Sequence, residues 1–135
     1  MKNRKIESIL AQQDAIRKEF GADSEELKNF YNTISNGAWS VITAYRKSQE
    51  KNFDEIVFTR DDLIWENDVE EILQFCKEAR IGWFVYGSGY SSAMDTILSM
   101  VNAGARVGSF VVKQYEAEMF GDKEIVKVPG FRINL

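Results

Sequence analysis

Residues 83–101, WFVYGSGYSSAMDTILSMV, contain the segment that decides the fold. Trp83–Tyr86 is a short run of aromatic and β-branched residues, which is typical of a buried strand. The glycine- and serine-rich loop Gly87–Ser92 follows it, and Ser91–Ala103 has apolar residues at the helical period. A strand that leads through a tight loop into a helix is the building unit of α/β proteins. We therefore predict an α/β fold.

The pattern continues on both sides of this segment. The sequence predicts three further strands and one more helix, at Glu55–Thr59, Arg106–Tyr115, Glu124–Asn134 and about 68–79. Strand–helix–strand units favour parallel pairing, whereas the turn at Phe120-Gly121-Asp122 indicates a hairpin. We expect a β-α-β-α-β-β sheet of about four strands, mostly parallel, with an antiparallel hairpin at its C-terminal edge. Pro129 favours an edge or a bulge, because proline cannot donate to a strand ladder.

The N-terminal third of the chain has the pattern of two helices. Apolar residues recur at the helical period over residues 3–20 and about 24–49, with Gly21 as a stop and Ser24 as a cap. Gly37 lies inside the second helix, where it lowers helix stability, so it indicates close packing, which we expect to involve the first helix. We predict a single domain over residues 1–135, with a helical hairpin or arm at 1–50 and the sheet core at 51–135.

The composition excludes several kinds of chemistry. The chain has no histidine and a single cysteine, Cys76. It therefore lacks a Ser-His-Asp or Cys-His arrangement and a Cys/His metal cage, and we expect a protein that is not an enzyme and has no cofactor. The weakest hypothesis is an enzyme that holds Mg²⁺ with Asp61 and Asp62, or with Glu66 and Asp68. The three tryptophans are expected in the core.

Bulk properties indicate where the protein works. No run of about 18 apolar residues is present, and residues 6–20 mix polar with apolar side chains, unlike a signal peptide. We expect a cytoplasmic protein that does not contact a membrane. Apolar residues of the N-terminal helices exceed what a small sheet needs to cover, which favours a homodimer.

The loop after Trp83–Tyr86 is a candidate anion site. Backbone N–H groups at the start of a helix attract phosphate, and glycines allow a phosphate to approach closely. Arg106 or Lys113 is expected to add positive charge, so the candidate ligand residues are Gly87, Ser88, Gly89, Ser91, Ser92 and Arg106. The loop matches neither the dinucleotide fingerprint nor a P-loop. A tight turn with a serine helix cap explains the same residues.

A second candidate surface is acidic. Residues 54–71 hold eight carboxylates and one arginine in a chain whose net charge is −4. Such a stretch repels nucleic acid and attracts a basic protein surface, although a solvated surface segment has the same composition. The candidate partner-binding residues are Asp61, Asp62, Glu66, Asp68, Glu70 and Glu71.

Three stretches between Phe58 and Leu135 carry a resemblance to a known family. They are Leu63–Glu70, Trp83–Tyr86 leading into Tyr90–Met94, and Val128–Ile133. The chain resembles uncharacterised small proteins of Gram-positive bacteria, many of them encoded on conjugative elements and prophages. The resemblance implies a mobile-element setting. The missing catalytic residues, the acidic stretch and the N-terminal helical arm favour, in that setting, a non-enzymatic accessory protein that binds a macromolecule, such as an anti-CRISPR-like inhibitor of host defence. The alternative is a protein that binds a small molecule or nucleotide at Gly87–Ser92.

Overall fold

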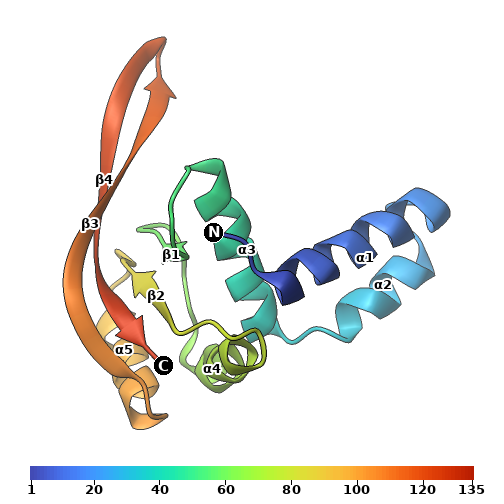
Figure 1. The fold of residues 1–135 in the computed structure, drawn as a ribbon, viewed down its shortest axis with the longest axis horizontal. Helices are drawn as coiled ribbons and strands as arrows, with labels where there is room; N and C mark the ends of the chain where they lie inside the picture. The colour runs from blue at the N-terminus through green and yellow to red at the C-terminus, as the bar shows by residue number, and fades with distance from the viewer.

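The fold joins a helical arm, a layer of helices and a twisted four-stranded sheet (Figure 1). The structure is a computed structural model and describes residues 1–135. It confirms the α/β class. In chain order the elements are α1 (Arg4–Phe20), α2 (Glu25–Asn32), α3 (Asn36–Glu50), β1 (Val57–Phe58), the 3₁₀ turn η1 (Glu66–Asp68), α4 (Val69–Glu78), β2 (Trp83–Tyr86), α5 (Ala93–Asn102), β3 (Arg106–Met119) and β4 (Asp122–Asn134).

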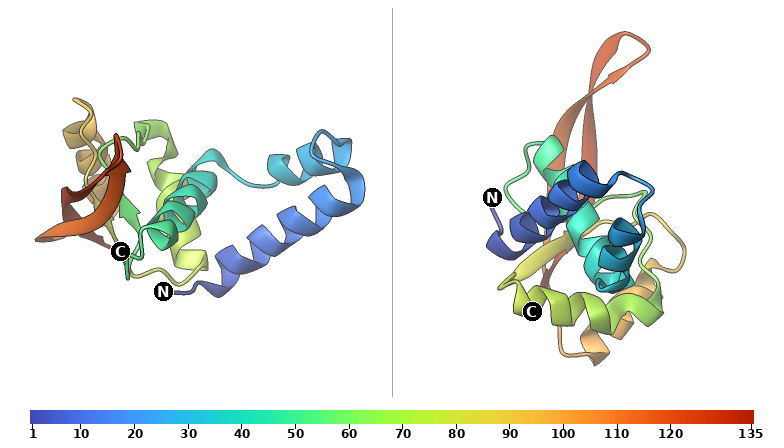
Figure 2. Two further views of the ribbon diagram at one scale, coloured as in Figure 1. Left: turned by 90° about the horizontal axis from the view of Figure 1, so that it is seen from above. Right: turned by 90° about the vertical axis from the view of Figure 1, so that its right-hand side faces the viewer.

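The arm consists of α1 and α2, which form a hairpin that projects away from the rest of the molecule (Figures 1 and 2). Gly21, at φ 97°, ends α1, and the Ser24 hydroxyl caps α2 by accepting from the Leu27 N–H at 3.2 Å. Only the base of α1 is anchored in the core. Ile6 is fully buried there, and the Asn3 N–H donates to the Tyr45 hydroxyl of α3 at 3.0 Å.

The expected single helix over residues 24–49 is wrong. The chain breaks at Thr33–Ser35, and the Ser35 hydroxyl caps α3 by accepting from the Ala38 N–H at 3.1 Å. The close packing expected at Gly37 exists, but its partner is α4 rather than α1. A Cβ atom at Gly37 would lie 2.5 Å from the Cβ of Glu71 and 2.7 Å from the carbonyl oxygen of Asp68. The glycine therefore allows α3 to approach the start of α4.

The expected sheet topology is met only in part. The strand order is β1-β2-β4-β3, so β3 runs in the direction of β1 and β2 but is separated from them by β4, and β1 and β2 are the only neighbours that pair in parallel. The hairpin of β3 and β4 is antiparallel as expected, but β4 lies inside the sheet and pairs with both β2 and β3. Because pairing with β2 ends at Phe131, Pro129 has a neighbouring strand on one side only. The proline therefore breaks no ladder in spite of its place in an inner strand.

Helices cover one face of the sheet. Phe58, Phe84, Tyr86 and Ile133 point from this face into a core that includes residues of α1, α3, α4 and α5. The other face has a small cluster of Phe53, Val57, Val85 and Val128. Beyond them the β3–β4 hairpin extends past the sheet as a long ribbon (Figure 2).

The tryptophans do not fill the core as expected. Trp65 is 63% exposed and Trp83 is 49% exposed, while Trp39 packs against the edge of the core. Ile64, next to Trp65, is the buried residue of that segment.

Candidate functional site

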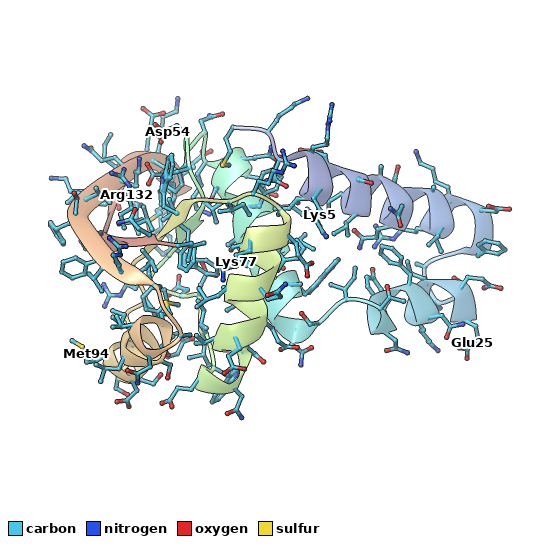
Figure 3. The ribbon with its side chains drawn as sticks, turned by 60° about the horizontal axis from the view of Figure 1, so that its bottom comes forward. Lys5, Glu25, Asp54, Lys77, Met94 and Arg132 are labelled. Atoms are coloured by element: carbon cyan, nitrogen blue, oxygen red, sulfur yellow. The ribbon has the colours of Figure 1, made fainter.

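A cleft of about 610 Å³ separates the arm from α4. Its apolar lining comes from three helices: Ile9 of α1, Ala38 of α3 and Phe75 of α4, together with Ile34 between α2 and α3. Its charged lining is mostly acidic, with Glu70, Glu71 and Glu78 from α4 against the single cation Lys5 from α1. Figure 3 shows Lys5 at the base of α1, on the side that faces α4.

Of the three glutamates that line the cleft, only Glu78 makes an ion pair. Lys5 contacts Glu78 at 3.3 Å, and the Gln74 amide donates to the same carboxylate at 3.0 Å. The hydrogen bond from Gln74, followed by the contact with Lys5, holds the pKa of Glu78 below its ordinary value. Glu70 and Glu71 make no ion pair within the chain, so their charge is available to an incoming cation.

Glu70 lies between the cleft and two further hollows of the surface. Besides the cleft, it lines two smaller hollows on the other side of α4, of about 390 and 380 Å³. The second of these is also lined by Glu66 and by Ser99 and Asn102 of α5. The structure thus places the exposed Glu66 and Glu70 on one hollow, whereas Glu71 is half-buried in the cleft beside Gly37 of α3.

The remaining acids of the predicted surface have other partners. Asp62 accepts from the Thr59 N–H at 2.7 Å and from Lys47 at 2.9 Å, so it holds the turn after β1. Asp61 is exposed, and Asp68 is half-buried against α3. Asp61 and Asp62 therefore do not form a matched pair of free carboxylates.

Asp54 and Glu55, the first two acids of residues 54–71, form ion pairs with basic side chains of the hairpin. Lys113 of β3 lies 2.9 Å from Asp54 and 2.8 Å from Glu55, and Arg132 of β4 lies 3.0 Å from Glu55. Figure 3 shows Asp54 and Arg132 beside the hairpin, far from the arm. Burial alone would raise the pKa of Glu55, but the bonds from Arg132 and Lys113 outweigh burial and lower it. The cluster fastens the segment before β1 to the hairpin.

A family model described as a domain of unknown function matches residues 40–135, which is more than two thirds of the chain. The chain belongs to the DUF7698 family. No curated protein and no solved structure matches it. The sheet, α4 and most of α3 lie within the DUF7698 match, whereas the arm lies outside it. The cleft is therefore built between the family domain and the segment that precedes it.

The glycines of the DUF7698 loop at 87–92 have packing roles. A Cβ atom at Gly87 would lie 2.6 Å from the carbonyl oxygen of Pro129, and one at Gly89 would lie 2.7 Å from the side chain of Arg60. Neither Ser91 nor Ser92 caps α5 with its side chain. The Ser88 hydroxyl accepts from the Tyr90 N–H at 3.3 Å within the loop.

The structure does not bring the expected cations to this loop. Arg106 lies next to Asn134, which pairs with Trp83 at the start of β2, whereas the loop follows the end of β2. Lys113 is bound to Asp54 and Glu55. Backbone carbonyls bind the loop instead: that of Phe58 accepts from the Gly87 N–H at 2.8 Å, and that of Arg60 accepts from the Gly89 N–H at 2.9 Å.

Metal-ligating and nucleophilic side chains are not gathered in one place. No set of three or more His, Cys, Asp or Glu residues is placed to hold a metal ion. Burial raises the pKa of the Cys76 thiol to about 12, so the sulfur is a packed apolar group rather than a thiolate. No helix has the length and apolar character needed to cross a membrane.

The sequence singled out the rim of the cleft but missed its floor. Glu70 and Glu71 were candidates because of their charge, whereas Ile34 and Phe75 were expected on two separate helix faces and Ile9 was not singled out. The apolar residues meet only because the chain turns at Thr33–Ser35 and brings α1 back over α4. The turn residues Thr33 and Ser35 were the available signal for that geometry.

Proposed function

We propose that this protein is a non-enzymatic binding protein that holds a basic, amphipathic segment of another protein in the cleft between the arm and α4. The observation that carries the proposal is the combination of an apolar floor, Ile9, Ile34 and Phe75, with the unpaired carboxylates of Glu70 and Glu71 at its rim. An amphipathic helix with lysine or arginine on its polar face matches both parts of this surface.

The chemistry of the lining supports a protein ligand over a small metabolite. Three glutamates against one lysine give the cleft a negative potential, which repels phosphate and nucleic acid. The cleft is open between three helices, and its charged groups are side chains on helices α1 and α4. Small-molecule sites more often enclose their ligand and hold it with fixed polar groups.

The arm supplies the part of the cleft that lies outside the DUF7698 match. Lys5, Ile9 and Ile34 belong to this segment, whereas Phe75 and the glutamates belong to the family domain. We propose that the family domain provides the acidic surface and that the arm adjusts which segment fits. The resemblance to proteins of mobile elements makes basic segments of host defence nucleases the partners to test first.

Binding of a defined peptide tests this proposal. The probe is a fluorescent 18-residue helix of leucine and lysine with all leucines on one face, and the readout is fluorescence anisotropy. The double variant E70K/E71K reverses the rim charge and is expected to weaken binding at least tenfold. The matched control is E118K/E124K, which makes the same change of charge at the hairpin and is expected to leave the affinity unchanged.

The apolar floor has its own test. I9D places a carboxylate among the apolar residues and is expected to abolish binding of the leucine–lysine helix while leaving the fold of the variant intact by circular dichroism.

Equal loss of binding in E70K/E71K and E118K/E124K would mean that only net charge matters, and the cleft would then not be the site.

A further inference from the structure

The outer edge of β3 is an unpaired strand edge of unusual length. β3 spans 14 residues, lies at the end of the strand order β1-β2-β4-β3, and has β4 as its only neighbour. Edge strands in natural proteins are mostly short, or are interrupted by proline or by charges that prevent pairing with another chain. From Phe110 to Met119 this strand pairs with β4 without a break, and none of these residues is proline.

The turn fixes which backbone groups point outward. Met119 and Asp122 flank a two-residue turn in which Phe120 and Gly121 both have positive φ, 52° and 85°. These values are typical of a type I′ hairpin, whose flanking residues form a hydrogen-bonded pair. Hydrogen-bonded and non-hydrogen-bonded pairs then alternate along the ladder. The N–H and C=O groups that point away from β4 belong to Phe110, Val112, Gln114, Glu116 and Glu118.

The same edge has exposed apolar side chains. Phe110 is 60% exposed and Val112 is 45% exposed, and Phe110 contacts the ring of Phe131 with centroids 5.5 Å apart. They lie on the sheet face that carries α5, where Met94 and Leu98 are also more than half exposed. Figure 3 shows Met94 on the side of α5 that faces away from α4. Exposed apolar side chains beside free backbone groups are typical of a pairing surface.

We infer that two copies of this chain pair antiparallel through β3, with a two-fold axis at Val112. The inference is independent of the cleft. In this register Val112 faces its own copy, and Phe110 faces Gln114. The four apolar side chains, Phe110 and Val112 from each copy, then form one continuous patch on the face that carries α5, and the free N–H and C=O groups find partners.

Charge and the bulge exclude the neighbouring registers. An axis at Lys113 places two lysines side by side and sets Phe110 against Glu116. An axis at Gln114 sets both Phe110 and Val112 against carboxylates, and an axis at Glu116 opposes two glutamates. An axis at Val111 pairs only Phe110 to Val112 before the irregular segment between Val107 and Phe110 is reached, whereas an axis at Val112 pairs the regular residues Phe110 to Gln114.

Opposite charges at the axis give a direct test. V112K and V112E each place like charges across the two-fold axis, so each variant alone is expected to be a monomer in sedimentation experiments in which the unmodified protein is a dimer. An equimolar mixture of the two variants is expected to regain the dimer. The matched control is I125K, which changes another exposed aliphatic residue of the hairpin, on β4 and away from the outer edge of β3, and is expected to remain dimeric.

Each result decides the proposal. A monomer for the unmodified protein at high concentration overturns it, as does a dimer that persists in V112K or a mixture that stays monomeric. Where a variant loses its circular dichroism signal, hydrogen exchange of the unmodified protein decides. The amides of Val112 and Gln114 are expected to exchange at least tenfold more slowly in concentrated than in dilute solution, and exchange that is independent of concentration overturns the inference.

Discussion

Gly37→Ala tests the contact between α3 and α4 that forms the back of the cleft. Alanine in place of glycine normally stabilises a helix by about 0.5–1 kcal/mol. At this position, however, the new Cβ would lie 2.5 Å from the Cβ of Glu71, 2.7 Å from the Asp68 carbonyl oxygen and 2.8 Å from the Ile72 nitrogen. Two of these three atoms are backbone atoms of another helix, so no side-chain rotation relieves the contact.

The magnitude follows from the displacement. Ordinary contacts of a Cβ atom begin at 3.4 Å, so α3 and α4 must separate by close to 1 Å. Overpacking of this kind costs about 1–3 kcal/mol, which exceeds the gain in helix propensity. We expect G37A to lower the free energy of unfolding by about 1–2 kcal/mol and the midpoint of thermal unfolding by about 3–8 °C.

Urea denaturation followed by circular dichroism measures this difference. The control is G82A, because no atom lies within 4 Å of a Cβ at Gly82 and its φ is not positive. We expect G82A to stay within about 0.5 kcal/mol of the unmodified protein. A G37A variant as stable as the unmodified protein, or more stable, would refute the close contact of α3 and α4.

Two further substitutions test the hairpin. E55Q removes the carboxylate that binds Arg132 and Lys113, and we expect it to lower the free energy of unfolding at neutral pH by about 1–3 kcal/mol. The pKa of Glu55 is lowered in the folded state, so the difference in free energy of unfolding between E55Q and the unmodified protein is present above the ordinary glutamate pKa. It disappears as the pH falls through the lowered pKa, and urea midpoints measured across the acid range would show this loss. A difference that grows on acidification would contradict the ion-pair account. F120N replaces a fully exposed side chain at φ 52° with the residue that type I′ turns prefer, so we expect the urea midpoint to rise by the equivalent of about 0.5–1 kcal/mol. A fall in that midpoint would show that the Phe120 ring stabilises the hairpin.

Local patterns predicted most elements but not their arrangement. The first helix, the strand Trp83–Tyr86, the helix after it and the turn at Phe120-Gly121 follow from periodicity and turn residues, and the structure confirms them. The break at Thr33–Ser35 was missed because the apolar stripe continues through both α2 and α3. The hydroxyls of Thr33 and Ser35 mark the break, but threonine and serine also occur inside helices, where their hydroxyls bond to the backbone in the same way.

The sheet order was missed for a different reason. β2, α5 and β3 form the strand–helix–strand unit that favours parallel neighbours, yet β4 lies between β2 and β3. The tight turn brings β4 next to β3 first, and Ile133 then fits the core beside Phe84. Pro129 indicated an edge strand, because the sequence does not show that the pairing of β4 with β2 ends before it reaches Pro129. The cleft was only half predicted for a similar reason. Its glutamates lie close together in the sequence, whereas the residues of its apolar floor lie far apart in the sequence.

The two proposed surfaces lie at opposite ends of the molecule, which has a consequence for binding. Figures 1 and 2 show the arm and the hairpin extending from opposite sides of the core. A dimer joined at Val112 therefore leaves both clefts open and presents them at its two far ends. A partner with two basic segments would bind such a dimer with an avidity that V112K removes, while the affinity for a single leucine–lysine helix stays unchanged. Comparing one-segment and two-segment peptides on V112K and on the unmodified protein separates the contributions of the two surfaces. Equal binding of both peptides to both proteins would mean that the clefts do not act together.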